Sequence, residues 1–485
     1  MTRRHVLLGT TTAEDATLLA EGFAAIRTEL DVPTEFSPEA LAAAAAAVGR
    51  DSQADGRADL RQLDFLTIDP PGSMDLDQAL HISRHRTRRG GGYRLRYAIA
   101  DLAAVLEPGG VLDVEARRRV QTLYGPDGRT PLHPPSLSEG AASLLPDQVR
   151  PALVWTMELD ADGEPQAVDV CRALVRSAAR WTYADAAAAL AAGQLGTDTS
   201  LALLAEVGPL RGARERERGG VSLPIPEQEV DQVEGGYRLS YRVPLELEGW
   251  NAQISLLTGM VAADLMLHGE IGVLRTLPDA PVGALGALRR TAVALGLAWP
   301  AEVTYPELLH SLDHRDPASI ALVQESTSLL RGAGYAAFDG ALPEVVHHSA
   351  VAAPYAHVTA PLRRLVDRFG LEVCVALCAG HDVPEWVHLA LPELPALMSR
   401  GEAWASAHER AVIDLIEAVV LRHAVGREFD GVVVDVADSG QGGIVQLIDP
   451  AVRARCHGAL PLGQRVRVRL HDVSVQERAS HFTLV

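Results

Sequence analysis

The segment Phe65–Ile82, FLTIDPPGSMDLDQALHI, places three aspartates, Asp69, Asp75 and Asp77, within nine residues. The apolar and β-branched run FLTI predicts a strand. Two prolines follow Asp69 and would end the strand there, because proline cannot donate to a sheet ladder. The run ALHI then resumes an extended pattern. The segment therefore predicts a stiff loop between two strands, with several carboxylates held close together.

Carboxylates crowded on one loop repel each other unless a cation lies among them or water surrounds them. Their hard oxygen atoms suit Mg²⁺ or Mn²⁺ rather than Zn²⁺. An EF-hand loop fits poorly, because its glycine and its terminal glutamate are missing. Two interpretations stay open: a metal site made by Asp69, Asp75 and Asp77, or a solvated acidic turn. Gln78, the next residue, is either a neutral neighbour or a replacement for a fourth carboxylate.

Strand-like and helical patterns divide the rest of the chain. Strand-like runs such as YRLRYAIAD come early, helical runs such as ISLLTGMVAADLMLHGEI come later, and no linker interrupts residues 57–425. This order predicts an α+β fold with one large body. Residues 1–56 predict a small helical module, which would contact nucleic acid, cap the structure or mediate oligomerisation. Residues 426–485, with short alternating strands and glycine turns, predict an OB-type β-barrel.

The net charge of −19 argues against a nucleic-acid partner, since phosphate contacts need positive charge. An arginine-lined channel inside an acidic shell would give the same sum. Arg465, Arg467 and Arg469 alternate on one predicted strand, either as a phosphate-facing stripe or as a solvated edge. No apolar run is long enough to span a membrane, and the N-terminal one is too short for a signal peptide. We therefore expect a soluble, cytoplasmic monomer without membrane association.

Four stretches resemble, in the same order, motifs of the ribonuclease II/R family, the RNB-domain 3′-to-5′ exoribonucleases. DLRQLDFLTIDPPGSMDLDQA is similar to the family signature T-I-D-x-x-x-A-R/K-D-x-D-D-A. The others are the stretch from YAIADL to LLPDQVRP, which includes LYGP and PSLSEGAASL, then RERERGGVSL, then HHSAVAAPYAHVTAPLRRLVD. The resemblance covers roughly residues 57–425, and an OB-type RNA-binding module commonly follows in the family. It implies an RNB-type catalytic body ahead of the barrel.

The resemblance implies hydrolysis of single-stranded RNA from its 3′ end to nucleoside 5′-monophosphates. Asp69, Asp75 and Asp77 match aspartates of a Mg²⁺ site at the bottom of a narrow channel, a site that Mn²⁺ would also suit. Two ions there would activate water and hold the phosphate for in-line attack. Arg363 matches an arginine that clamps the phosphate and stabilises charge in the transition state.

Four further residues match substrate-binding positions of the family. Tyr124, in LYGP, matches an aromatic residue that stacks on a base, the alternative being a core tyrosine. Arg218, in RGGVSL, is either a contact to the RNA backbone or a surface arginine. Arg364 either supports that backbone or forms an ion pair with Asp367. Glu409, in AHERAV, matches a helix glutamate near the active site, the alternative being a solvated helix face.

The chain also departs from the family pattern. Gln78 stands in place of the fourth aspartate, which predicts either activity with altered metal affinity or a catalytically inactive RNA-binding scaffold. Ala360 and Leu365 replace a serine and a tyrosine around the arginine pair. A family glutamate ahead of the helix near Met260 corresponds to Leu257 or Thr258. The two cold-shock modules usual in the family are replaced by about fifty-five residues of helical pattern, so the preference for structured or unstructured RNA stays open.

Overall fold

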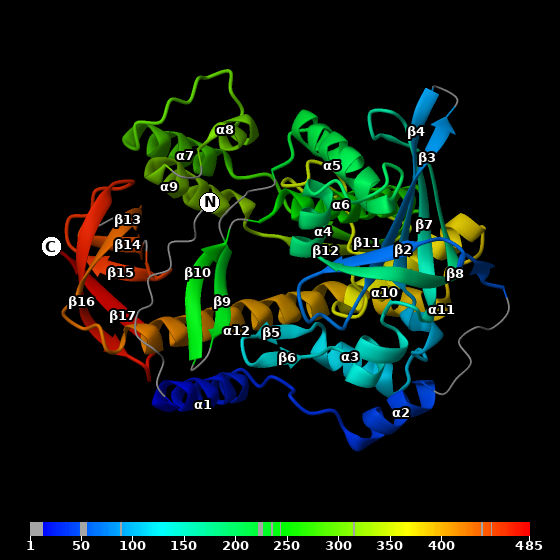
Figure 1. Cartoon of the computed structure of the whole chain (residues 1–485), viewed down its shortest axis with the longest axis horizontal. Coiled ribbons are helices and arrows are strands. Elements are labelled where there is room, and N and C mark those ends of the chain that lie inside the picture. Colours follow the sequence, from blue (N-terminus) through cyan, green and yellow to red (C-terminus); the bar gives the residue numbers. More distant parts are fainter. Residues whose placement is uncertain are drawn as a thin grey trace.

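The α+β prediction is confirmed in a computed structural model, in which a mixed sheet, a set of covering helices and a C-terminal barrel follow one another (Figure 1). The structure describes residues 13–48, 56–87, 90–221, 227–233, 236–242, 244–313, 316–437, 440–447 and 449–485. Within them no helix is both long enough and apolar enough to cross a membrane.

Six strands form the sheet, in the spatial order β1 (Ala58–Asp59), β8 (Pro165–Thr182), β2 (Phe65–Asp69), β3 (Gln78–Thr87), β4 (Gly90–Ala100) and β7 (Val149–Leu159). The long strand β8 pairs antiparallel with β7 along its first part and parallel with β2 along its last part. The predicted strand FLTI is therefore a central strand, and its last residue, Asp69, stands opposite Thr182.

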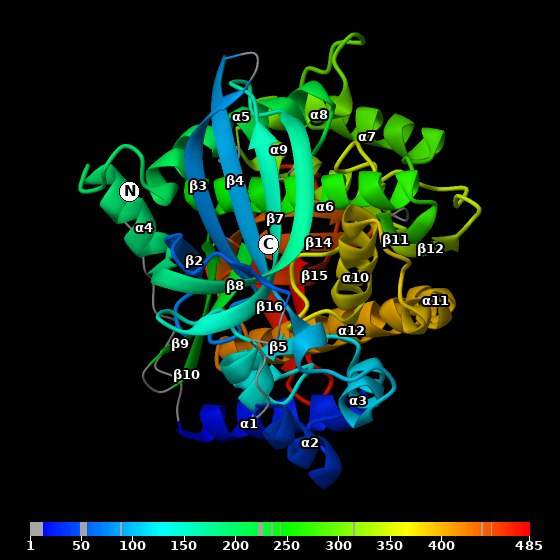
Figure 2. The same cartoon turned by 90° about the vertical axis from the view of Figure 1, so that its right-hand side faces the viewer.

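Helices α5 (Ser200–Glu217), α6 (Glu246–His268) and α10 (Leu365–Ala379) pack against this sheet (Figure 2). Large buried side chains join the layers, among them Tyr97 and Trp155 from the sheet and Phe369 from α10. Burial of apolar surface on this scale is the main stabilising term in a chain of this length. The core lies directly behind the strand ends that carry the aspartates.

The two N-terminal helices, α1 (Ala13–Glu29) and α2 (Pro38–Val48), contribute to different cores. Helix α1 buries Leu19, Phe23 and Ile26 against α12 (Leu394–Leu421) and the C-terminal barrel. Helix α2 buries its alanine face in the cluster under the sheet. The domain boundary at residue 56, the boundary at 426 and a nucleic-acid contact by the first module stay predictions.

The C-terminal barrel is closed, in the order β13 (Glu428–Val436), β14 (Gly442–Leu447), β15 (Arg453–His457), β17 (Ala479–Leu484) and β16 (Arg465–Ser474). This confirms the OB-type prediction. Strand β16 pairs with β13 and with β17, so it is not an edge strand, although its three arginines are exposed to solvent. Arg467 and Arg469 both lie on the exposed face and share Glu428 as an ion-pair partner.

The remaining elements connect these parts. They are α3 (Val111–Arg119), β5 (Leu123–Gly125), β6 (Gly128–Thr130), α4 (Tyr183–Ala191), β9 (Glu227–Val233), β10 (Gly236–Arg242), β11 (Ile271–Thr276), α7 (Val282–Ala294), α8 (Tyr305–Ser311), α9 (Pro317–Ser326), β12 (Gly334–Asp339) and α11 (Glu385–Ala390).

Candidate active site

The loop that carries the aspartates begins with a tight turn after Asp69. The amide of Ser73 donates to the carbonyl of Pro70 at 3.3 Å. Gly72 occupies the third position of this turn with φ +82°, a backbone angle that side chains disfavour. Proline at the second position and glycine at the third are the residues that a type II turn requires. The turn is thus encoded locally by the run DPPGS.

The hydroxyl of Ser143 fixes the middle of the loop. It accepts a hydrogen bond from the amide of Leu76 at 3.0 Å and donates one to the carbonyl of Met74 at 2.6 Å. Ser143 and Leu76 are completely buried. Asp75 lies between the two bonded backbone groups and Asp77 directly follows, so both carboxylates are placed by a side chain from the PSLSEGAASL motif.

Asp77 lies deepest in the site, with only 4% of its surface exposed. Its Oδ1 accepts a hydrogen bond from the amide of Leu362 at 2.7 Å, and its Oδ2 lies 3.3 Å from Nε of Arg363. Burial raises the pKa of Asp77 to about 8, although the charge of Arg363 and the Leu362 amide both favour the ionised form. The segment containing Arg363 is therefore attached directly to the aspartate loop.

Asp75 binds two side chains of one hairpin. The hydroxyl of Tyr124 donates to its Oδ2 at 3.0 Å, and Nη1 of Arg129 donates to its Oδ1 at 2.5 Å. Tyr124 and Arg129 are cross-strand partners on β5 and β6, so the hairpin presents both to the same carboxylate. The aromatic ring itself is accessible, because Tyr124 is 53% exposed, so the interpretation of Tyr124 as a core tyrosine is wrong.

Asp69 is partly buried, at the end of β2. Burial raises the pKa of Asp69 to about 6. The positive charges of Arg363 and Arg180 lower it, and the negative charge of Asp75 raises it further. Burial therefore disfavours the ionised form of Asp69 more than these arginines favour it, and a divalent cation would offset that penalty.

The residues fit a hard divalent ion in their donor chemistry. In the part of the chain that the structure describes, no group of three histidine, cysteine or acidic residues lies close enough to hold one ion. Mg²⁺ commonly takes only one or two protein carboxylates and completes its shell with water and substrate phosphates. The set of Asp69, Asp75 and Asp77 is compatible with that mode, and the assignment of ligands among them stays a prediction.

Gln78 is engaged in the protein and does not face an open position. Its Nε2 donates to the carbonyl of Thr359 at 2.6 Å, and its Oε1 accepts from the hydroxyl of Tyr97 at 2.6 Å. The same hydroxyl lies 2.8 Å from Oγ of Ser255 on α6. Both ends of the amide are thus used to connect β3, β4 and α6 with the segment that leads to Arg363.

The two arginines of the PLRR motif have different environments. Arg363 is 47% exposed beside the aspartates. Arg364 instead forms two hydrogen bonds with the fully buried Asp367, at 2.8 and 2.9 Å. The ion-pair alternative for Arg364 is therefore confirmed, and an RNA contact by it stays a prediction. Ala360 and Leu365 are both buried.

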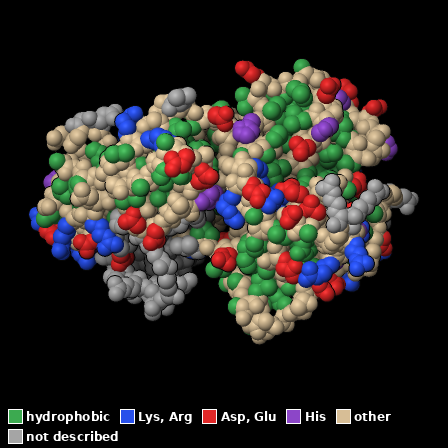
Figure 3. Space-filling view, turned by 90° about the horizontal axis from the view of Figure 1, so that it is seen from above, with side chains coloured by type: hydrophobic (Ala, Val, Ile, Leu, Met, Phe, Trp, Pro, Cys, Tyr) green, Lys and Arg blue, Asp and Glu red, His purple; other side chains and the backbone are tan. Residues whose placement is uncertain are grey.

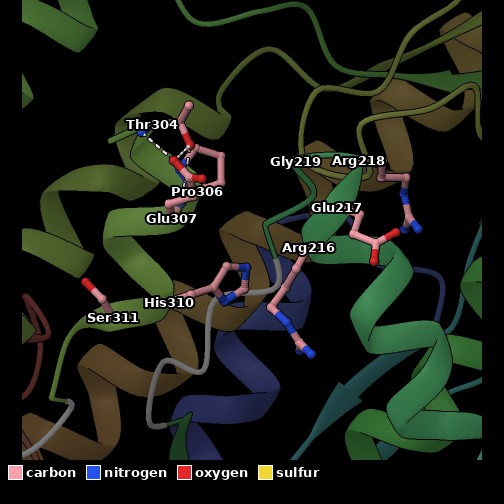
Figure 4. Close-up of a pocket in the computed structure, with 9 residues that line it drawn as sticks. All are labelled: Arg216, Glu217, Arg218, Gly219, Thr304, Pro306, Glu307, His310 and Ser311. Carbon is pink, nitrogen blue, oxygen red and sulfur yellow. Dashed lines mark hydrogen bonds between the residues drawn. The ribbon is translucent and has the colours of Figure 1, made fainter. Parts of the chain in front are cut away.

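Arg218 lies away from this group, at the C-terminal end of α5. Its Nε donates to the carbonyl of Val351 at 2.7 Å. It borders a cavity of about 480 Å³ between the end of α5 and α8. Figure 4 shows Arg216 and His310 facing this cavity, with Glu217 between Arg216 and Arg218. No contact joins Arg218 to the aspartates in the described residues, and its role in RNA binding stays a prediction.

The helix position Glu409 is exposed on α12. Its neighbour His408 is buried, with its ring beside the β5–β6 turn. A contact between Glu409 and RNA stays a prediction. Leu257 and Thr258 lie inside α6 and not ahead of it, and both are buried in the core.

Two arginines of the site were not predicted from the sequence. Arg129 could have been found from the run LYGPDGRT, because a hairpin with a two-residue turn pairs Tyr124 with Arg129. Arg180 comes near Asp69 only through the parallel pairing of β2 with β8, for which the sequence carries no local signal. On the face shown in Figure 3, acidic and basic side chains are intermixed, so the acidic shell expected from the net charge is not uniform.

Comparison with known proteins assigns both main parts of the chain to known families. Residues 57–369 match the RNB domain, and residues 427–485 match the RNase II-type exonuclease C-terminal S1 domain. Ribonuclease R of Escherichia coli is 28% identical over 89% of this chain and 57% of its own length. Exosome complex exonuclease RRP44 homolog A of Arabidopsis thaliana is 30% identical over 68% of this chain and 36% of its own length.

Solved structures share the fold. RNase R of Mycoplasma genitalium in complex with ribose methylated single-stranded RNA aligns with a TM-score of 0.86 at 18% identity, covering 96% of this chain and 78% of that one. Yeast Ssd1, described as a pseudonuclease, aligns with a TM-score of 0.68 at 17% identity, covering 87% and 52%.

The fold and the aspartate loop are those of a protein with an RNB-type body followed by an S1/OB-type barrel. The chain belongs to the RNB-domain family, whose match covers more than half of it. It spans 57% of the length of the curated ribonuclease R to which it was compared.

Proposed function

We propose that this protein is a divalent-metal-dependent 3′-to-5′ exoribonuclease that hydrolyses single-stranded RNA to nucleoside 5′-monophosphates, acting as a monomer in the cytoplasm. One observation supports this most: one short segment carries Asp69, Asp75 and Asp77, and within it Asp75 contacts Tyr124 while Asp77 contacts Arg363. These are the residue types that phosphodiester hydrolysis needs, and a hydrogen bond and an ion pair connect two of the aspartates to the aromatic and the cationic side chain.

Each of these groups would have a separate task in phosphodiester hydrolysis. Mg²⁺ or Mn²⁺ held by the aspartates would activate water and neutralise charge on the phosphate. Arg363, half exposed and next to Asp77, is suited to bind the scissile phosphate and the charge that develops on it. Tyr124 offers an exposed ring on which the terminal base can stack, while its hydroxyl stays fixed on Asp75. Stacking is tolerant of sequence, which suits stepwise degradation.

The test uses 5′-labelled single-stranded RNA with Mg²⁺ or Mn²⁺, and the variant Asp77→Asn beside the wild type. The asparagine keeps an oxygen for the Leu362 amide but removes the charge. We expect products that shorten progressively from the 3′ end with the wild type, and cleavage reduced by at least about a hundredfold in the variant. Release of nucleoside 5′-monophosphates, measured by chromatography, checks which bond is cut.

A second candidate is an RNA-binding scaffold without catalysis. Two observations favour it: Gln78 stands where the family signature has an aspartate, and the fold is shared with the pseudonuclease Ssd1. In the same assay a scaffold would bind the labelled RNA, as seen by a mobility shift, and leave its length unchanged with either metal. That result would overturn the exonuclease proposal and retain RNA binding.

A further inference from the structure

The hairpin that carries Tyr124 and Arg129 is short. Strands β5 and β6 have three residues each, joined by the two-residue turn Pro126–Asp127. A two-stranded hairpin of this size is not stable alone in water. Its position over Asp75 must therefore be maintained by contacts from other parts of the chain.

One of these contacts reaches the tip of the hairpin from the N-terminal helix. Nη1 and Nη2 of Arg27, in the last turn of α1, donate to Oδ1 and Oδ2 of Asp127 at 3.1 and 2.8 Å. The arrangement is bidentate, and both side chains are about three-quarters buried. A charge-assisted pair of this geometry is stronger and more directional than an ordinary surface ion pair.

Helix α1 is itself firmly held. Asp15 near its start lies 2.8 Å from Nε of Arg422 at the end of α12. Glu29 at its end accepts hydrogen bonds from Arg478 of the barrel at 2.6 and 2.7 Å. Between them Gly22 lies so close to Leu415 of α12 that any side chain there would collide with it. The helix can therefore transmit a fixed position from α12 and the barrel to the hairpin.

We infer that α1 is a positioning element for RNA binding, and that Arg27 acts through Asp127 to hold the hairpin so that the ring of Tyr124 faces the substrate. In Figure 1, α1 runs alongside α12 with the hairpin above it, and Figure 2 shows the same neighbourhood from the side. The inference rests on the proposed role of Tyr124 in RNA binding. It gives the N-terminal helix a function inside the catalytic body, distinct from a contact with RNA of its own.

The experiment compares Arg27→Gln with Arg478→Gln as a matched control. Both variants remove one arginine–carboxylate contact of α1, but only the first one touches the hairpin. Hydrogen–deuterium exchange of residues 122–130, measured by mass spectrometry without RNA, reports the hairpin directly. Steady-state cleavage of single-stranded RNA gives KM and kcat. Asp127→Ala removes the same contact from the other side and serves if Arg27→Gln does not fold.

We expect Arg27→Gln to speed hydrogen exchange at residues 122–130 by about threefold to tenfold. This is the size of effect expected when a partly buried ion pair is lost. KM should rise by a similar factor and kcat should stay within about twofold, because stacking on Tyr124 contributes equally to the bound substrate and the transition state. Arg478→Gln should change the hairpin exchange and KM much less, because the Asp15–Arg422 pair and the packing of Gly22 on Leu415 still hold α1.

Three results would overturn the inference: unchanged exchange at the hairpin, an equal effect of Arg478→Gln, or an unchanged KM in a variant with faster exchange. If the wild type cleaves no RNA, the proposed function fails instead. RNA affinity, measured by fluorescence anisotropy, then replaces KM, and the exchange comparison still decides the role of Arg27.

Discussion

The side-chain amide of Gln78 donates a hydrogen bond to the backbone carbonyl of Thr359, with 2.6 Å between nitrogen and oxygen. Its other end accepts from the buried hydroxyl of Tyr97. Thr359 lies four residues before Arg363, so Gln78 and its neighbour Asp77 both attach the aspartate loop to the arginine segment. An ionised aspartate cannot donate to a carbonyl. At this position the glutamine therefore does something that the family's aspartate cannot do.

This relationship predicts that Gln78→Asp does not increase activity. The carboxylate would face the Thr359 carbonyl without a proton to offer, and it would add negative charge beside Asp77. We expect a loss of about 1–3 kcal/mol in the free energy of unfolding, as for a buried polar group left without its partner. RNA cleavage should be no faster than in the wild type. Urea denaturation and steady-state kinetics measure the two effects.

Tyr97→Phe is the matched control for this variant, since it removes the hydrogen bond to the other end of the amide, together with the one to Ser255, and leaves the Thr359 contact in place. It should destabilise the protein by about 1 kcal/mol without adding charge. Faster cleavage by Gln78→Asp at unchanged stability would contradict the structural role of Gln78. The missing carboxylate would then be what limits the rate.

A second prediction concerns Ser143, whose hydroxyl bonds to the backbone on both sides of Asp75. Ser143→Ala removes both hydrogen bonds in a fully buried setting, so we expect a loss of about 1–3 kcal/mol in stability. Because the loop that presents Asp75 and Asp77 loses its support, kcat should fall by about tenfold or more. Thermal unfolding and single-turnover cleavage provide the measurements.

Ser138→Ala is the control, because Ser138 is also buried in the same motif but bonds only to the carbonyl of His133, at 3.2 Å. It should reduce stability with little change in kcat once the protein is folded. Equal losses of kcat in the two variants would show that Ser143 acts through general stability and not through the aspartate loop.

The sequence predicted what is encoded locally. Strand β2, the turn after Asp69 and the closed barrel follow from β-branched runs, prolines and glycines that act over a few residues. Arg363 and Tyr124, which the family motifs singled out, contact Asp77 and Asp75 in the structure, and their roles on RNA stay predictions.

What the sequence did not reveal depends on distant pairing. Arg180 reaches Asp69 through the parallel ladder of β8, and Arg27 reaches Asp127 across a hundred residues. The sequence also does not show what a glutamine does at this position that an aspartate could not do. The difference is the amide hydrogen of Gln78, and its importance is visible only once its acceptor, the Thr359 carbonyl, is known. The sequence therefore indicated a departure at Gln78 but not its structural use.

A third prediction separates the two functions of Tyr124. Tyr124→Ala removes the exposed ring and should weaken binding of single-stranded RNA by about 1–3 kcal/mol, the usual contribution of one stacked base. Tyr124→Phe keeps the ring and loses only the hydrogen bond to Asp75, so its RNA affinity should stay within about threefold of the wild type. Fluorescence anisotropy in the Asp77→Asn background measures affinity without cleavage.

Similar affinities for the alanine and phenylalanine variants would contradict stacking. If both were weak, the hydroxyl on Asp75 would be the important group. If both bound normally, Tyr124 would not contact RNA at all.

The last prediction concerns pH and His133, which is only 2% exposed. Burial, followed by the positive charge of Arg368, lowers the pKa of His133 to about 3. In the unfolded chain a histidine titrates near pH 6.5. Above that pH both states are neutral and the residue costs nothing. As pH falls from about 6.5 toward 3, only the unfolded state takes up the proton, so stability is lost at up to about 1.4 kcal/mol per pH unit.

His133→Leu should therefore show a shallower loss of unfolding free energy between pH 6 and pH 4. The control His471→Leu, at an exposed position on β16, should keep the wild-type slope. Denaturant titrations at half-unit intervals measure these slopes, and the same slope in His133→Leu as in the wild type would mean that the imidazole is protonated or solvated in the folded protein.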